Sequence, residues 1–134
     1  MLSLKGKIVA ITGIGSPDKP KGNGRAIAEL FARQGAFVEG IDCQEKEGKR
    51  SHDAIRKAGG SCRFTLGDVT SETDVNAWIT AVMSYHGRLD ILINNVGQSE
   101  RMLPEAVDTA CWQKQMELNL NSVMMTCRAA LPHM

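Results

Sequence analysis

The sequence lacks a strong charge of either sign, long apolar runs and paired cysteines. A formal net charge of +1 over 134 residues gives no electrostatic reason to expect nucleic acid or a membrane surface as a partner. No apolar run approaches the roughly 20 residues of a membrane-spanning helix, and residues 1–7 lack the apolar core of a signal peptide. We therefore expect a cytoplasmic protein without membrane or nucleic-acid partners.

The cysteines and histidines are scattered along the chain. The four cysteines form no C-x-x-C pair: Cys43, Cys62, Cys111 and Cys127. This spacing favours reduced core thiols over a disulfide framework or a zinc site, and the three histidines give no metal-binding pattern either. A chain of 134 residues is long enough for one domain with a sizeable core and too short for two ordinary ones.

A strand, a glycine-rich turn and a helix organise the N-terminal part. Residues 7–12 predict a buried parallel strand, because apolar residues follow one another without polar alternation. Gly13 and Gly15 follow it, and Gly22 and Gly24 precede the helix. Free N–H groups and a partial positive charge at a helix N-terminus bind phosphate, and glycine lets the backbone approach closely. The turn therefore predicts a phosphate site, although the common G-x-G-x-x-G spacing fails here.

The helix after this turn is predicted over residues 25–34 and ends at Gly35, which supplies a left-handed stop. Ile27, Leu30 and Phe31 recur at i, i+3, i+4 spacing. We expect this face to pack on the strand.

Apolar and periodic segments alternate through the rest of the chain. Strands are predicted at 36–41, 62–66 and 89–93, and helices at 44–58, between Ser71 and Gly87, and from about Thr109 to the C-terminal end. This alternation predicts an α/β fold of the Rossmann type: a doubly wound open parallel sheet in strand order 3-2-1-4, with helices on both faces. A ligand is expected beyond the carboxyl ends of the strands, where the order reverses between strands 1 and 4.

Asp42 closes the second predicted strand. Its distance from the glycine turn is close to the roughly 20 residues that separate such a turn from the acid holding an adenosine ribose. A carboxylate there accepts both ribose hydroxyls and repels a 2'-phosphate, which favours NAD over NADP. The alternative is that Asp42 merely begins a turn.

The glycine turn resembles the cofactor turn of the short-chain dehydrogenase/reductase family. The matching residues are Thr12, Gly13, Gly22, Asn23 and Gly24, and the inserted residues 17–21 depart from the family's pattern. The resemblance implies an oxidoreductase that moves a hydride between NAD(P) and a small-molecule alcohol or carbonyl substrate. In the family, a basic residue before the second glycine often accompanies NADP, and Lys21 stands there. We still expect NAD in preference to NADP, because the direct ribose contact of Asp42 discriminates more sharply.

The segment Asn94-Asn95-Val96-Gly97 follows the fourth predicted strand. It is similar to the family's N-N-A-G signature, with Val96 in place of alanine. The resemblance implies that these four residues bind the cofactor, with Asn94 and Gly97 near the nicotinamide ribose. The amides are also expected to tie neighbouring strands together.

Asp68 and Val69 follow the third predicted strand and match a family pair at the adenine ring. The resemblance implies that Asp68 meets the adenine amine while the backbone of Val69 lies along the ring. An ordinary turn that leads into a helix cap is the alternative.

Asn119 is the one candidate catalytic residue. Trp112, Asn119 and Leu120 have the spacing of a family motif whose asparagine belongs to the catalytic constellation. Because Asn119 interrupts the apolar stripe of the last helix on the face of Trp112 and Met116, the alternative is a core asparagine satisfied by backbone or water.

The rest of the family's catalytic set is not found. That set needs a tyrosine with a lysine four residues later, and a serine; the only tyrosine, Tyr85, is followed four places on by Leu89. We therefore expect residues 1–134 to form the NAD(P)-binding Rossmann domain of such an enzyme, incomplete at its C-terminal end and inactive alone. The uncovered apolar stripe of the last helix predicts a homo-oligomer through that helix. A non-catalytic NAD-binding or dimerisation module is the alternative.

Overall fold

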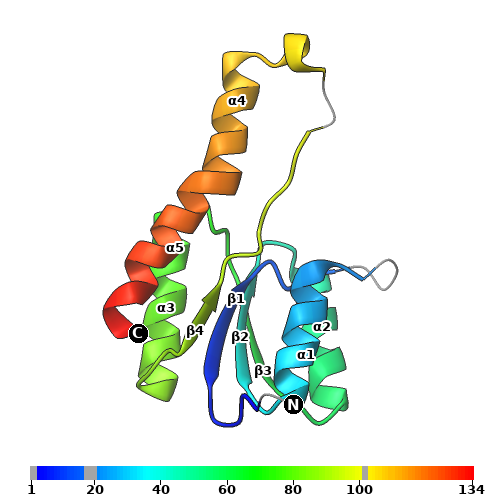
Figure 1. Ribbon diagram of the computed structural model, residues 1–134, viewed down its shortest axis with the longest axis vertical. Coiled ribbons are helices and arrows are strands. Elements are labelled where there is room, and N and C mark those ends of the chain that lie inside the picture. Colours follow the sequence, from blue (N-terminus) through cyan, green and yellow to red (C-terminus); the bar gives the residue numbers. More distant parts are fainter. Residues whose placement is uncertain (1–2, 17–20, 101–102) are drawn as a thin grey trace.

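In the part of the chain that the structure describes, four parallel strands form a single sheet (Figure 1). The computed structural model describes residues 3–16, 21–100 and 103–134. The strands are β1 (Ile8–Thr12), β2 (Phe37–Asp42), β3 (Ser61–Leu66) and β4 (Ile91–Ile93). Their spatial order is β3-β2-β1-β4, and each pair of neighbours runs parallel. The predicted α/β class and strand order 3-2-1-4 are confirmed.

Helices cover both faces of the sheet, as predicted. The α-helices are α1 (Asn23–Arg33), α2 (Glu45–Lys57), α3 (Glu72–His86), α4 (Thr109–Met116) and α5 (Ser122–Ala130). In Figure 1, α1 and α2 lie on one side of the strands and α3 and α5 on the other. Within the described residues, no helix combines the length and apolar character needed to cross a membrane.

Two hydrophobic cores, one on each face, follow from the alternation of side chains along the strands. Val9 and Ile11 of β1 belong to the core beneath α1 and α2. Ile8 and Ala10 belong to the core beneath α3 and α5, where Trp78 is almost fully buried. All five residues of β1 are buried, which is the pattern of a parallel strand covered on both faces.

Helix α1 packs on the sheet through small residues. Ala28 and Ala32 are buried, whereas Leu30 is 46% exposed and Ile27 and Phe31 are half-buried. The prediction that Leu30 faces the strand is wrong. The buried arc of the helix runs through residues four apart, Gly24, Ala28 and Ala32, because Gly24 lies directly against the turn after β1.

Helix α3 follows the sequence prediction closely. The Ser71 side chain accepts a hydrogen bond from the Asp74 N–H at 3.3 Å, which caps the N-terminus, and Gly87 ends the helix at φ 69°. The predicted apolar face is buried or partly buried in the core: Val75, Trp78, Ile79, Val82 and Met83.

The last helical segment is interrupted by a π-helical turn, Glu117–Asn121, between α4 and α5. Short 3₁₀ turns, Pro104–Ala106 and Leu131–His133, lie before α4 and after α5. Helix α5 packs beside α3, while α4 extends beyond the carboxyl ends of the strands (Figure 1). The sequence predicted the helical periodicity but not the π turn, which is a frequent feature of functional sites.

Candidate functional site

A cavity of about 350 Å³ lies at the carboxyl ends of β1, β2 and β4, beside the N-terminus of α1. Its lining includes these residues predicted from the sequence: Gly13, Gly15, Gly22, Asn23, Gly24, Asp42, Asn95, Val96 and Gly97. We call this cavity the cleft. Its place between β1 and β4 is where the strand order reverses and where a ligand of a doubly wound sheet is expected.

The glycine turn brings α1 into direct contact with the end of β1. A Cβ atom on Gly24 would lie 1.9 Å from the Gly13 carbonyl oxygen and 2.6 Å from Asn95 Nδ2. Gly13 itself has a φ of +71°, a conformation that L side chains rarely adopt. Both positions therefore require glycine, and together they set the floor of the cleft.

Among the residues that the structure describes, no side chain caps the N-terminus of α1. Gly22 occupies the N-cap position, and no acidic residue lies in the first turn. The Gly22 N–H donates to Ser16 Oγ at 2.6 Å, which fixes the approach of the chain to the helix. The N–H groups that follow point along the helix axis with the positive end of its dipole, so this helix end fits a phosphate group.

Asp42 is held in place by the backbone on both sides. The Gly15 N–H donates to Asp42 Oδ2 at 2.7 Å, and the Gln44 N–H donates to Asp42 Oδ1 at 2.9 Å. A Cβ atom on Gly15 would lie 2.7 Å from Oδ2, so glycine is needed for this contact. A carboxylate offers about four acceptor positions. The fixed Asp42 therefore keeps acceptor capacity for a diol in the cleft.

A smaller cavity of about 50 Å³ adjoins Asp42. The other residues that line it are Cys43, Gly67, Asp68, Val69, Val96 and Leu118. Asp68 Oδ1 accepts hydrogen bonds from the N–H and the hydroxyl of Thr70, at 2.8 and 2.7 Å. These bonds form the ordinary turn that was the alternative interpretation of Asp68, and the residue also borders the smaller cavity. The side chain of Val69 is buried in the core.

Asn95 joins β1 to the segment after β4, as expected for an amide that ties strands. Its Nδ2 donates to the carbonyl oxygens of Thr12 and Gly13, at 3.1 and 3.0 Å. In return, Thr12 Oγ1 accepts from the N–H groups of Asn95 and Val96, at 2.9 and 3.1 Å. Thr12 is 2% exposed and does not line the cleft, but its hydroxyl positions Asn95 and Val96, which do.

Asn94 turns away from the cleft toward α5. Its Oδ1 accepts from Thr126 Oγ1 at 2.6 Å, and its Nδ2 contacts Cys127 Sγ at 3.4 Å. Successive side chains of an extended segment point to opposite faces. One amide of the pair therefore serves the cleft and the other fixes α5 against the sheet.

Asn119 lies in the π turn and is exposed, so it is not the core asparagine of the alternative interpretation. Its Nδ2 donates to the carbonyl oxygens of Gln98 and Gln115, both at 2.9 Å, and its Oδ1 accepts from the Gln98 N–H at 2.9 Å. Asn119 thereby holds the segment after Gly97 against the helix. Its catalytic role stays a prediction.

Several residues that line the cleft were not predicted from the sequence: Cys43, Gln44, Gln98 and Leu118. Ser16, which accepts the hydrogen bond from the Gly22 N–H, was not predicted either. Cys43 and Gln44 follow Asp42 directly, and adjacency to a predicted strand end could have indicated them. Leu118 had no such signal, because the π turn brings it to the cleft from far along the chain.

The four cysteines are free thiols, but only Cys62 is buried, so the expectation of core thiols holds for that residue alone. Burial raises the pKa of Cys62 to about 12. Partial burial, with the charges of Asp42 and Asp68, also raises the pKa of the Cys43 thiol. Cys43 therefore lines the cleft as a neutral thiol. Across residues 3–16, 21–100 and 103–134, no group of three His, Cys, Asp or Glu side chains is arranged to hold a metal ion.

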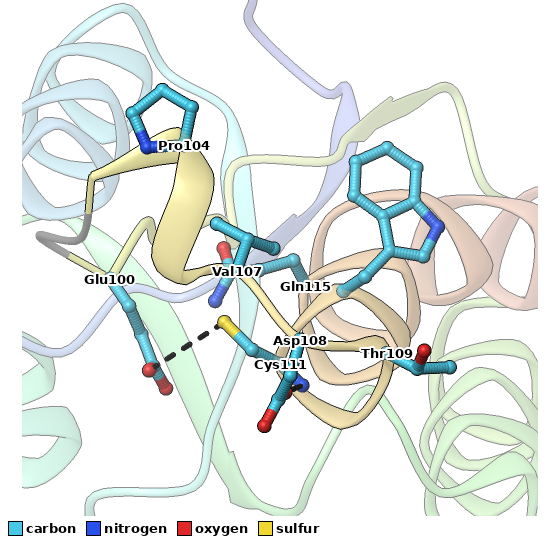
Figure 2. A pocket seen from close by; sticks show the side chains of 8 residues that line it. Glu100, Pro104, Val107, Asp108, Thr109, Cys111 and Gln115 are labelled. Carbon is cyan, nitrogen blue, oxygen red and sulfur yellow. Dashed lines mark hydrogen bonds between the residues drawn. The ribbon is translucent and has the colours of Figure 1, made fainter.

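A third cavity, of about 670 Å³, lies at the start of α4 (Figure 2). Its lining residues are Glu100, Pro104, Val107, Asp108, Thr109, Cys111, Trp112 and Gln115. None of the predicted site residues lines it, and it shares no lining residue with the cleft. The volume of a cavity alone does not identify the functional site. The groups suited to a phosphate and a diol line the cleft of about 350 Å³ instead.

The inserted residues of the glycine turn, 17–20, lie outside the described residues, and Lys21 is the part of the insertion that the structure describes.

The sequence signature described as short chain dehydrogenase matches residues 7–134. The chain is 34% identical over 131 residues to 3beta-hydroxysteroid dehydrogenase 1 of Eggerthella lenta, covering 97% of this chain and 48% of that protein. It is also 34% identical over 130 residues to L-fucose dehydrogenase of Oryctolagus cuniculus, covering 96% of this chain and 43% of that protein.

A crystal structure of a short-chain dehydrogenase/reductase from Burkholderia xenovorans superposes with a TM-score of 0.93 at 40% identity. The match covers 98% of this chain and 52% of that one. The chain therefore spans about half the length of the proteins it matches.

Proposed function

The chain belongs to the short chain dehydrogenase family, and we propose that it binds NAD as the cofactor-binding domain of an oxidoreductase acting on an alcohol or carbonyl substrate. The observation that carries this proposal is the cleft itself. An uncapped helix N-terminus, a fixed carboxylate and a glycine-lined floor share one cavity at the carboxyl ends of β1, β2 and β4. When bound, NAD supplies a carbon that accepts or donates a hydride.

The residues of the cleft fit the parts of a dinucleotide. The N–H groups at the start of α1, from Asn23 onward, hold the pyrophosphate, and Asp42 accepts the hydroxyls of the adenosine ribose. Asp68 and Val69, which line the smaller cavity next to Asp42, lie on the side of the adenine. Gly97 lies toward the nicotinamide ribose, where a Cβ atom would meet Asn119 Oδ1 at 3.0 Å.

NAD is preferred over NADP because Asp42 is oriented by two backbone N–H groups. A fixed negative charge at the ribose repels a 2'-phosphate. Calorimetric titration of both dinucleotides tests this preference, with tighter binding of NAD as the expected result. Tighter binding of NADP would contradict it, and no binding of either would refute the function proposed for the cleft.

Residues 1–134 alone are expected to bind NAD without turnover. Tyr85 lies near the C-terminal end of α3, where its ring contacts those of Phe37 and His86 and stacks under Arg63. It is not among the residues that line the cleft. Spectrophotometry of NADH formation with a panel of alcohols tests this expectation. Turnover would place a proton-transferring group among these residues. Absence of turnover with NAD bound fits both the proposed cofactor-binding domain of an oxidoreductase and the alternative of a non-catalytic NAD-binding module.

Self-association through the last helix is the remaining part of the proposal. Leu120, Met124 and Leu131 are 54%, 50% and 64% exposed on this helical segment. Burial of these side chains between two copies removes apolar surface from water. Sedimentation velocity is expected to detect a dimer that Met124→Glu dissociates.

We also propose a cytoplasmic location, since a reducing compartment preserves the four free thiols.

A further inference from the structure

Two cations flank the start of α1 and share one carboxylate. Lys21 Nζ lies 2.6 Å from Glu29 Oε2, and Arg25 Nε lies 2.9 Å from Glu29 Oε1. Glu29 is about two turns into the helix, outside the cleft lining, and its two oxygens are divided between the two cations.

Lys21 is the cation best placed to reach the cleft from this group. It directly precedes Gly22, which lines the cleft together with Gly15 and Asp42. Its ammonium is carried on a flexible four-carbon stem. That stem lets the ammonium move between the Glu29 carboxylate and another anion near Gly22.

We propose that Glu29 is a specificity-determining residue for the dinucleotide, because it binds Lys21 and withholds that cation from the 2'-phosphate of NADP. This inference rests on the proposed function of the cleft. Asp42 disfavours NADP by repulsion, and Glu29 disfavours it by removing an attraction. The two acids act at different points, and each can be tested without the other.

The geometry of the pair suits a competition of this kind. The Lys21 and Glu29 side chains are 43% and 21% exposed, so the pair forms at the surface. An exposed ion pair contributes only about 0–1 kcal/mol, and that contribution limits how strongly Glu29 can withhold Lys21 from a phosphate. Partial burial acts to raise the pKa of Glu29, but hydrogen bonds from Lys21 and Arg25 hold it below its usual value. Glu29 is therefore ionised and able to hold both cations at neutral pH.

The test is Glu29→Gln, with the dissociation constants of NAD and NADP measured by calorimetry. NADP affinity is expected to rise about threefold to fivefold relative to NAD, the range that the loss of one exposed ion pair permits. The double variant Glu29→Gln with Lys21→Gln should return the ratio to that of the wild type. Asp53→Asn is the control, because Asp53 is an exposed carboxylate on α2 whose Oδ1 lies 2.9 Å from His52 Nδ1, and it does not line the cleft.

A second variant keeps the inference testable if Glu29→Gln fails to fold. Lys21→Gln alone should leave NADP affinity unchanged, since Glu29 already binds the lysine; a loss of NADP affinity would show that Lys21 reaches the phosphate despite Glu29. An unchanged ratio in a folded Glu29→Gln variant that still binds NAD overturns the inference and leaves the proposed function standing. Failure of the wild type to bind either dinucleotide refutes the proposed function instead.

Discussion

Two acids on β2 lie three positions apart and have opposite surroundings. Glu39 is 1% exposed and belongs to a charged cluster beneath α3. Asp42 is only partly buried and faces the cleft at the end of the strand. The contrast shows which features turn a carboxylate into a structural group and which leave it ready for a ligand.

The partners of Glu39 are side chains that fill its surroundings. His86 Nε2 lies 2.7 Å from Glu39 Oε1, and Arg63 Nη1 lies 3.4 Å from the same oxygen. The guanidinium of Arg63 stacks on the ring of Tyr85 at 4.2 Å, and Phe37 packs edge-on against His86. A buried charge needs such partners, and once they are present no room is left for a ligand.

The partners of Asp42 are backbone N–H groups of its own end of the sheet, from Gly15 and Gln44. Backbone donors orient the carboxylate without covering it. The two carboxylates therefore differ in role because Glu39 is enclosed by side chains deep in the sheet, whereas Asp42 lies at the strand end and is oriented by backbone donors.

The largest expected effect in this comparison is on stability at Glu39. Glu39→Ala leaves His86 and Arg63 without their shared acceptor, and removing one partner of a buried pair costs roughly 3–5 kcal/mol. Urea denaturation should show this loss in the free energy of unfolding. Glu45→Ala, which removes an exposed carboxylate on α2, should cost less than about 1 kcal/mol. A similar small loss for both variants would contradict the structural role of Glu39.

A smaller effect, on binding rather than folding, is expected at Asp42. Asp42→Ala removes a charged acceptor from the cleft, and such hydrogen bonds contribute about 1.5–3 kcal/mol, or roughly 10-fold to 100-fold in the dissociation constant of NAD. Calorimetry of NAD binding measures it. Asp53→Ala on α2 is the control, since its carboxylate is 78% exposed and remote from the cleft lining. Equal NAD affinity in the two variants would remove Asp42 from the site.

The smallest effect concerns Asp90, a third acid, at the opposite end of the sheet. A hydrogen bond from Arg88, with one from the Ile8 N–H at 2.9 Å, lowers the pKa of Asp90 to about 2. Because this value lies below the unfolded one, Asp90 stabilises the fold above about pH 4, and the stabilisation is lost as the pH falls toward 2.

The Asp90 contribution is expected to be under about 1 kcal/mol because its side-chain partners are exposed. Asp90→Asn should flatten the change in unfolding free energy between pH 4 and pH 2, as followed by urea titration at each pH. An unaltered slope in that window would show that other carboxyl groups account for it.

Most of the fold was predictable because its elements are marked locally. Unbroken apolar residues predicted β1, and the Ser71 cap with its apolar face predicted α3. Leu30 shows the limit of such patterns: its spacing suits a buried face, yet small residues face the sheet instead. The close approach of α1 to β1 at Gly24 selects that arc of the helix, and periodicity does not report how closely two elements approach.

The candidate site was predictable where its residues follow strand ends. Asp42 and Asn95 both line the cleft, as the ends of neighbouring parallel strands should. The opposite orientations of Asn94 and Asn95 were not predictable, since the sequence does not say which face of the segment receives α5. Leu118 was missed because nothing in the local pattern indicates a π turn.

The sequence by itself determined the order of strands and helices and the chemical groups available at the strand ends, because both depend on local spacing and residue type. Tertiary structure alone decided how those groups are used. It buried Glu39 beside His86 and Arg63, left Asp42 open beside the glycine turn and set Glu29 across from Lys21. Burial and distance are properties of packed elements, and they determine whether a charge binds its neighbours or a ligand.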